Sequence, residues 1–293
     1  MKGIILAGGN STQLHPATVP ISKQLLPIYD KPMIYYPLSV LMSSKIRDIL
    51  IITTPQDQSH FQTLLKDGSQ WGIKISYEIQ QHPNGIADAF IIGEKFIGND
   101  NVVLILGDNI FWGSYLTTKL SNATFREKGA TIFAYPVNNP ERYSVVEIDK
   151  SYIPHIRSLE EKPSTPKSNY AVTGLYCYDN HVIEYVNKLS LSEREQLEIT
   201  DLNNIYLYLG DLHVEIMDET CLWLNTDTPE SILQASQLVQ TIQTRHGTLI
   251  ASPEIIAYKN KFINEFKLSQ LANESDIDNV YSEYLLKAIN IPV

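Results

Sequence analysis

The first half of the chain alternates short apolar runs with helical patterns, and this alternation constrains the fold more than any other feature. Near-continuous apolar runs predict strands at residues 3–7, 48–54, 74–80 and 102–108. The spacing of apolar residues between them predicts helices at residues 32–44, 56–66 and 85–96. Strands that are apolar on both faces and separated by helices are typical of a parallel sheet covered on both sides. The sequence therefore predicts an α/β, Rossmann-like fold.

The second half is richer in strand-like runs and ends in helical patterns. Further strands are predicted at residues 131–137, 143–148, 155–163, 170–179, 212–218 and 221–226, with one helix at 201–209. Helices are then predicted at residues 230–245, 254–262 and 279–289. No low-complexity linker separates these parts. We expect a mixed, mainly parallel sheet in one domain over residues 1–227, followed by a C-terminal helical appendage over residues 228–293.

The charge balance bears on the class of partner. The 293 residues include 33 acidic and 23 basic side chains, which gives a formal net charge of −10. Such a chain is poorly suited to nucleic acid or an anionic membrane, and no apolar run is long enough to span a bilayer. The apolar run at residues 4–7 is also too short for a secretion signal. We expect a cytoplasmic protein without a nucleic-acid or membrane partner.

Candidate ligand-binding residues follow the predicted strands, because open parallel sheets bind ligands beyond the carboxyl ends of their strands. Gly8 and Gly9 follow the first strand, Gln80 ends the third, and Asp108 ends the fourth. A glycine pair lets backbone N–H groups approach a phosphate, but it can also form a simple turn. The segment has the spacing of neither a dinucleotide fingerprint nor a P-loop. Lys23 is the cation expected near this edge.

Several ordered sequence blocks resemble the glucose-1-phosphate thymidylyltransferases of the sugar nucleotidylyltransferase family. The resemblance extends from Lys2 to about Leu286. It rests on the blocks "SKQLLPIYDKPMIYYPLS", "LGDNIF", "SLEEKP", "SNYAVTGLY", "LEITDLN" and "WLNT". It implies a fold of the nucleotide-diphospho-sugar transferase type, with a catalytic domain at residues 1–227 whose sugar-binding part is roughly 131–227. The C-terminal helices would then serve assembly into a homo-oligomer, a tetramer.

The same resemblance implies a reaction and its participants. A phosphate oxygen of glucose 1-phosphate would attack the α-phosphorus of dTTP, giving dTDP-glucose and pyrophosphate. Such a reaction depends on alignment and on neutralisation of charge by cations and Mg²⁺. The partners implied are therefore dTTP and glucose 1-phosphate, or a dTDP-sugar, with Mg²⁺ as the cofactor.

Site residues are carried over from the matching motifs. The nucleotide-binding positions are Gly8, Gly9, Ser11, Thr12, Gln80 and Gly85. The sugar-binding positions are Tyr143, Ser144, Glu161 and the backbone at Val172. The catalytic positions are Lys23, Lys162 and Gln13, and the metal-binding positions are Asp108 and Asn225. Plainer interpretations stay open from the residues alone, since Glu161 and Lys162 could be an exposed strand pair and Asp108 could cap a following helix.

The sequence departs from the family pattern at several of these positions. Ser11 and Ser144 replace glycines, Gln13 replaces an arginine, and Asn225 replaces a metal-binding aspartate. Asp227 replaces a glycine in the same segment. Loss of a guanidinium and of a carboxylate removes charge from a site that handles phosphates and Mg²⁺, which prefers carboxylate oxygen.

Three functions therefore remain open from the sequence. The first is transfer of a thymidylyl group to glucose 1-phosphate, with activity reduced by the departures at Gln13 and Asn225. The alternative is a catalytically inactive homologue that binds a nucleotide or sugar nucleotide and acts as a regulatory or partner subunit. The third is uridylyl or adenylyl transfer to another sugar phosphate, because a single amide side chain is a modest base selector.

Overall fold

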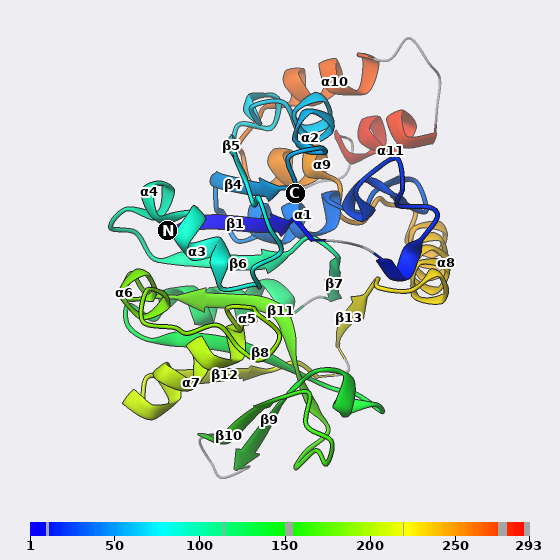
Figure 1. Ribbon diagram of the computed structural model, residues 1–293. Coiled ribbons are helices and arrows are strands. Elements are labelled where there is room, and N and C mark those ends of the chain that lie inside the picture. Colours follow the sequence, from blue (N-terminus) through cyan, green and yellow to red (C-terminus); the bar gives the residue numbers. More distant parts are fainter. Residues whose placement is uncertain (10–11, 114, 150–154, 219, 275–279, 290–293) are drawn as a thin grey trace.

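A nine-stranded sheet forms the centre of the computed structural model, which describes residues 1–9, 12–113, 115–149, 155–218, 220–274 and 280–289. The main path of the sheet runs in the order β10-β9-β11-β6-β1-β4-β5 (Figure 1). Two further strands extend it, since β8 pairs with β11 and β12 pairs with β8. The strands are β1 (Lys2–Ala7), β4 (Asp48–Thr53), β5 (Lys74–Ile79), β6 (Val102–Leu106), β8 (Ala130–Pro136), β9 (Ser144–Asp149), β10 (His155–Glu161), β11 (Tyr170–Tyr178) and β12 (Leu212–Ile216).

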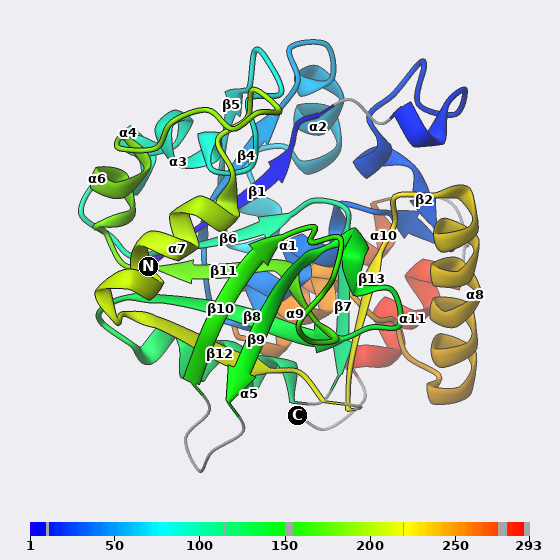
Figure 2. The same cartoon turned by 60° about the horizontal axis from the view of Figure 1, so that its bottom comes forward.

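The sheet changes from parallel to antiparallel at β11. Strands β6, β1, β4 and β5 are parallel, and Ile5 of β1 lies between Ile51 of β4 and Ile105 of β6. β11 is antiparallel to β6, β8 and β9, while β9 and β10 form an antiparallel hairpin at the end of the sheet away from β5 (Figure 2). The predicted mixed, mainly parallel sheet is confirmed. Its N-terminal half is parallel, and the later strands pair antiparallel except for β12, which runs parallel to β8.

Helices cover both faces of the sheet, as predicted. Ile5 and Ala7 of β1 belong to one core cluster, and Ile4 and Leu6 belong to the other, because successive side chains of a strand point to opposite faces. The first face is covered by α1 (Tyr35–Ser43), α2 (Gln58–Leu65), α5 (Leu116–Phe125) and α9 (Pro253–Lys259). The second face is covered by α3 (Asp88–Ile92), α4 (Glu94–Ile97), α6 (Val182–Val186) and α7 (Ile199–Leu209).

One predicted helix is divided in the structure. In place of a helix over residues 85–96, the structure has two short helices, α3 and α4, which begin at Asp88 and meet at Gly93. A Cβ at this glycine would lie 2.9 Å from Ile4 Cδ1 and 3.4 Å from Leu50 Cδ2. The chain therefore breaks where its backbone packs directly on the central strands. The prediction of one continuous helix was wrong because tertiary packing overrides local periodicity here.

Two small ribbons lie beside the main sheet. β7 (Asn109–Gly113) pairs with β13 (Cys221–Asn225), and β2 (Pro27–Ile28) pairs with β3 (Lys31–Pro32). β7 follows β6 after two residues, so the ribbon begins at the ligand-binding edge of the sheet. β13 leads in turn to the C-terminal helices.

The C-terminal appendage consists of helices in the described part of the chain. They are α8 (Pro229–His246), α9, α10 (Glu265–Asn273) and α11 (Val280–Ile289), and α9 packs against α1. Thr228 caps α8, because its hydroxyl accepts from the backbone N–H of Ser231 and Ser231 returns a bond. Residue 279 of the last predicted helix lies outside the described residues. In the described ranges, no helix is both long enough and apolar enough to cross a membrane.

Candidate active site

A narrow slot lies beyond the carboxyl ends of β1 and β5, and backbone forms its walls. A Cβ at Gly8 would lie 2.7 Å from Oε1 of Gln80, so the two residues are in direct contact. Gly85 has a φ of +105°, and a Cβ there would lie 2.4 Å from the carbonyl oxygen of Leu197. A side chain at Gly85 would collide with the backbone of Leu197, and one at Gly8 would press on the amide of Gln80. Gln80 is buried, and its side-chain amide faces into this space.

The slot opens into a cavity of about 400 Å³. Gly8, Gly9, Gln80 and Gly85 are among the residues that line it. Its wall also holds side chains of both charges, namely Glu161, Lys162, Arg194 and Glu198. The structure thus brings together six of the residues assigned from the sequence, and the volume suits a small ligand.

Glu161 ends β10 and is held by three side chains. Its carboxylate accepts from Ser144, from Thr200 Oγ1 at 2.6 Å and from Arg194 Nη2 at 2.9 Å. Burial raises the pKa of Glu161, but these three hydrogen bonds outweigh it and hold the pKa below its ordinary value. Glu161 is therefore a fixed carboxylate at the cavity wall and not a member of an exposed strand pair.

Lys162 follows Glu161 with a left-handed backbone. Its φ is +43°, a conformation that costs energy for a residue with a side chain. Its backbone N–H donates to the carbonyl of Tyr143 at 3.1 Å. The side chain is exposed and lines the cavity. Strain of this kind is found where a side chain must be aimed at a ligand.

Lys23 joins two carboxylates from distant parts of the chain. It opens a short 3-10 helix, Lys23–Leu25, and its Nζ contacts Asp108 and lies 2.8 Å from Oδ1 of Asp227. Burial opposes protonation of Lys23, but the two carboxylates outweigh it and raise its pKa. Burial likewise opposes ionisation of Asp108, and Lys23 and Asn109 reverse this and lower the pKa of Asp108. Since β7 follows Asp108, the interpretation of Asp108 as a helix cap was wrong.

Asn225 lies beside this ion-pair cluster. It pairs across the β7–β13 ribbon with Asn109, the residue after Asp108. Its buried Oδ1 atom has no hydrogen-bond partner among the described residues. Asn225 and Asp227 also line a hollow of about 220 Å³ next to Tyr143, whose ring packs against Trp223 at 5.3 Å between centroids.

Other residues assigned from the sequence lie apart from these groups. Thr12 and Gln13 are exposed on the 3-10 helix Thr12–Leu14. Val172 of β11 is buried in the core, 7% exposed. Ser11 lies outside the described residues. The structure therefore brings neither Gln13 nor Val172 to the wall of the cavity.

The sequence did not single out Arg194 or Thr200, although both hold Glu161. Arg194 stands between two glutamates in a segment without a motif, which is the usual pattern of a solvated charge. Its spacing of four residues from Glu198, with which it also pairs at 3.0 Å, is a weak signal of order. Thr200 belongs to the block "LEITDLN", whose chemistry is not evident without the position of Glu161.

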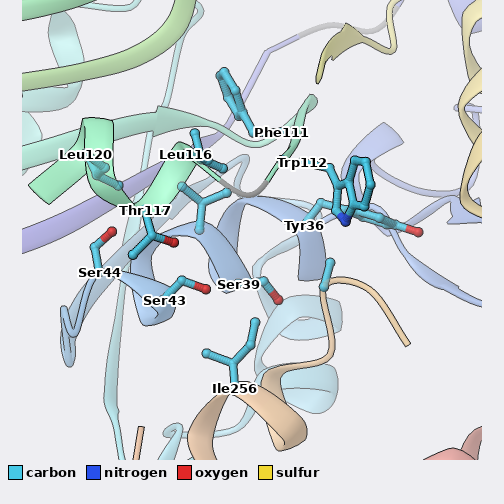
Figure 3. A pocket seen from close by; sticks show the side chains of 13 residues that line it. Tyr36, Ser39, Ser43, Ser44, Phe111, Trp112, Leu116, Thr117, Leu120 and Ile256 are labelled. Carbon is cyan, nitrogen blue, oxygen red and sulfur yellow. The ribbon is translucent and has the colours of Figure 1, made fainter. Parts of the chain in front are cut away.

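A separate hollow of about 120 Å³ lies between α1, α5, β7 and α9 (Figure 3). The hydroxyls of Ser39, Ser43 and Thr117 lie around it, with aromatic and aliphatic side chains between them. None of the described residues that line it carries a charge. It offers no cation to a phosphate, in contrast to the cavity at the sheet edge.

A slot walled by glycines and the Gln80 amide opens into a cavity lined by the exposed Lys162 and by Arg194, which is ion-paired with Glu161 and Glu198. The fold and this lining suit an α/β protein that binds a phosphate-bearing ligand. Residues 2–242 match the family model described as nucleotidyl transferase. The chain belongs to the nucleotidyl transferase family.

Several relatives are similar over nearly their whole length. The chain is 53% identical to the glucose-1-phosphate thymidylyltransferase of Neisseria meningitidis serogroup A, covering 99% of both chains. It is 51% identical to the protein of that name from Xanthomonas campestris, covering 97% of this chain and 95% of the relative. A solved structure from Bacillus anthracis, assigned the same activity and bound to sucrose, matches with a TM-score of 0.75 and 40% identity, covering 81% of this chain and 94% of that one.

A more distant structure shows the fold alone. A UDP-glucose pyrophosphorylase bound to UDP-glucose matches with a TM-score of 0.72 at 22% identity, covering 82% of this chain and 98% of that one. The predicted nucleotide-diphospho-sugar transferase fold is confirmed by both structures.

Proposed function

We propose that this protein is a glucose-1-phosphate thymidylyltransferase that forms dTDP-glucose and pyrophosphate from dTTP and glucose 1-phosphate. The observation that carries the proposal is the single cavity that joins the Gln80 slot to Glu161, Lys162 and Arg194. In this proposal Gln80 recognises the base, and Glu161 with the cations Lys162 and Arg194 binds the sugar phosphate. The relatives that are about half identical over the full chain carry this activity in their names.

The proposal gives these residues the following parts in the reaction. In the reaction, an oxygen of the sugar phosphate forms a bond to the α-phosphorus while the bond to the β-phosphate oxygen breaks, and pyrophosphate leaves with that electron pair. Gln80 and the two slot glycines hold the base. Lys162 and Arg194 face the sugar phosphate, and Glu161 accepts from sugar hydroxyls. Catalysis then consists of alignment and charge neutralisation, because phosphoryl groups require little covalent help from the protein.

The residues near Lys23 fit Mg²⁺. Asp108 and Asp227 converge on the Nζ atom of Lys23. Asn225, whose side-chain oxygen has no partner among the described residues, pairs across the ribbon with Asn109, the residue after Asp108. Carboxylate and carbonyl oxygens are the ligands that Mg²⁺ prefers, and it commonly keeps water and substrate phosphates in the rest of its shell. When bound, the ion supplies positive charge to the phosphates. Among the described residues, no group of three or more acidic, histidine or cysteine side chains forms a metal site.

Lys23 also supplies positive charge, in addition to the ion. Its ammonium group neutralises Asp108 and Asp227, which would otherwise repel each other and the phosphates. A phosphate that binds to Lys23 must exchange these contacts for its own. We therefore assign Lys23 to charge neutralisation around the triphosphate.

Assembly and compartment complete the proposal. We propose a homo-oligomer, a tetramer, in the cytoplasm. Support comes from exposed apolar side chains near α8, where Leu233 is 59% exposed and Tyr29 is 43% exposed. The backbone N–H of Tyr29 donates to Ser236 on the same helix, so the two side chains belong to one surface. Light scattering should report a multiple of 33.2 kDa, and a monomer at all working concentrations would contradict this part.

A nucleotide panel tests the reaction. Pyrophosphate release is measured with Mg²⁺, glucose 1-phosphate and, in turn, dTTP, UTP and ATP. We expect dTTP to be used best, with one dTDP-glucose formed for each pyrophosphate. Binding of dTTP by calorimetry without any turnover would favour the inactive binding subunit instead. Preference for UTP or ATP would favour transfer of another nucleotide.

A further inference from the structure

Asp88 is a buried carboxylate with no part in the reaction described above. It is the first residue of α3 and is only 7% exposed. Its Oδ2 accepts from Nε2 of Gln80 at 2.9 Å. The carbonyl oxygen of Gly85 accepts from the same nitrogen at 3.2 Å. Burial of a carboxylate costs free energy unless hydrogen bonds offset it, and for Asp88 the donor is the side-chain amide of Gln80. We therefore ask what this pairing does for Gln80.

The chemistry of these two neighbours fixes the side-chain amide of Gln80. A carboxylate and a carbonyl can only accept hydrogen bonds, whereas an amide has an NH₂ end that donates and an oxygen end that accepts. The NH₂ end must therefore face Asp88 and Gly85, and both of its hydrogens are used there. The oxygen end must point the other way, toward Gly8, where Oε1 is indeed found.

We propose that Asp88 is a positioning residue that sets base specificity, because it holds Gln80 with its acceptor oxygen in the slot. The inference rests on the proposed function, since it assigns the slot to the base of the nucleotide. The oxygen accepts from the ring N–H at position 3 of thymine or uracil. Cytosine has an unprotonated nitrogen at that position, so two acceptors would face each other and its binding would be disfavoured.

The test is the substitution Asp88→Asn, which keeps the size of the side chain. An asparagine can offer either an oxygen or an NH₂ group to Gln80, so only the carbonyl of Gly85 still requires the NH₂ end. The Gln80 amide then turns over more readily and presents its donor end to the base. We compare kcat/KM for dTTP with kcat/KM for dCTP, each with glucose 1-phosphate. The ratio of kcat/KM for dTTP to kcat/KM for dCTP is expected to fall by about 10-fold, which is the effect of leaving one buried hydrogen-bonding group unsatisfied.

Asp179→Asn is the matched control. Asp179 is also buried, 6% exposed, and accepts from Gly129 and Tyr206 away from the cavity. The control should lower thermal stability without changing the dTTP to dCTP ratio. If Asp88 has a merely structural role, Asp88→Asn should behave like the control and lower kcat/KM for both nucleotides equally. That result would overturn the inference.

A double substitution shows whether Asp88 acts through Gln80. In the Gln80→Leu background, Asp88→Asn should leave the ratio unchanged, because the amide that it positions is gone. A further fall in the ratio would contradict the inference. Dissociation constants for dTTP and dCTP from calorimetry provide a second readout that needs no turnover. Absence of pyrophosphate release from the unmodified protein would overturn the proposed function, while the ratio of dissociation constants would still test Asp88.

Discussion

Two carboxylate clusters of the proposed site differ in how they are satisfied: Glu161, here called the sugar end, and Asp108 with Asp227, here called the phosphate end. At the sugar end, Glu161 is held by two hydroxyls and one guanidinium. At the phosphate end, Asp108 and Asp227 are satisfied by Lys23. Under the proposed function, Lys23 is itself a cation for the phosphates. One end is therefore preorganised, and the other must exchange an internal ion pair for its ligand.

Among the substitutions that test this comparison, removal of Lys23 is expected to have the largest effect on activity. Lys23→Met leaves the two carboxylates facing each other and takes a cation from the phosphates, so kcat should fall by roughly 10²- to 10³-fold. The measurement is pyrophosphate release, with thermal unfolding recorded alongside because a buried unpaired carboxylate also destabilises the fold.

Lys188→Met is the matched control for that change. Lys188 is an exposed lysine paired with Glu184 on the protein surface, so its loss should leave kcat unchanged. Lys23→Arg keeps the charge and guards against misfolding. Full activity in a folded Lys23→Met protein would show that the ion pair is structural and that the two ends do not differ in function.

A smaller effect is expected from returning a carboxylate at position 225. Asn225→Asp should lower the Mg²⁺ concentration for half-maximal activity by about tenfold, because Mg²⁺ prefers carboxylate oxygen. The same shift should be seen in Mn²⁺ binding followed by electron paramagnetic resonance without substrates. If neither the Mg²⁺ requirement nor Mn²⁺ binding changes, Asp227 already supplies the negative charge that Asn225 lacks. The phosphate end then has lost less metal-binding charge than its sequence indicates.

The smallest effect is expected at the sugar end. The hydroxyl of Ser144 donates to Glu161 and lies 2.9 Å from Thr200 Oγ1, so it competes with sugar hydroxyls for the carboxylate. Ser144→Gly should lower KM for glucose 1-phosphate about two- to fivefold, the worth of one ordinary hydrogen bond. KM for dTTP serves as the internal control. A higher KM for the sugar phosphate would mean that Ser144 orients Glu161 instead of competing for it.

The sequence predicted the frame of the site better than its contacts. Gly8, Gln80 and Asp108 were placed at one sheet edge because the carboxyl ends of parallel strands meet there, and this rule depends only on strand order. The ion pair between Lys23 and Asp227 joins residues 204 positions apart, at the ends of a 3-10 helix and of a ribbon. Periodicity carries no information on such a contact.

Short polar side chains were the hardest to interpret. Ser144 was recognised as a departure from glycine, but its effect depends on Glu161 and Thr200 being within reach, which only the packing of β9, β10 and α7 determines. Gln13 was assigned to the catalytic position of an arginine that bears on the phosphates, and it is exposed on a 3-10 helix outside the cavity wall. Its role stays a prediction.

The walls of the base slot have a consequence for the evolution of this site. A side chain at Gly85 would collide with the backbone of Leu197, and a side chain at Gly8 would displace the Gln80 amide. A lineage that moved toward another nucleobase could not reshape the slot by small replacements there. Viable mutational steps would have to pass through the few side chains that project into it, Gln80 first. Nucleobase preference should therefore drift more slowly in descendants of this protein than sugar preference, which depends on replaceable side chains such as Ser144.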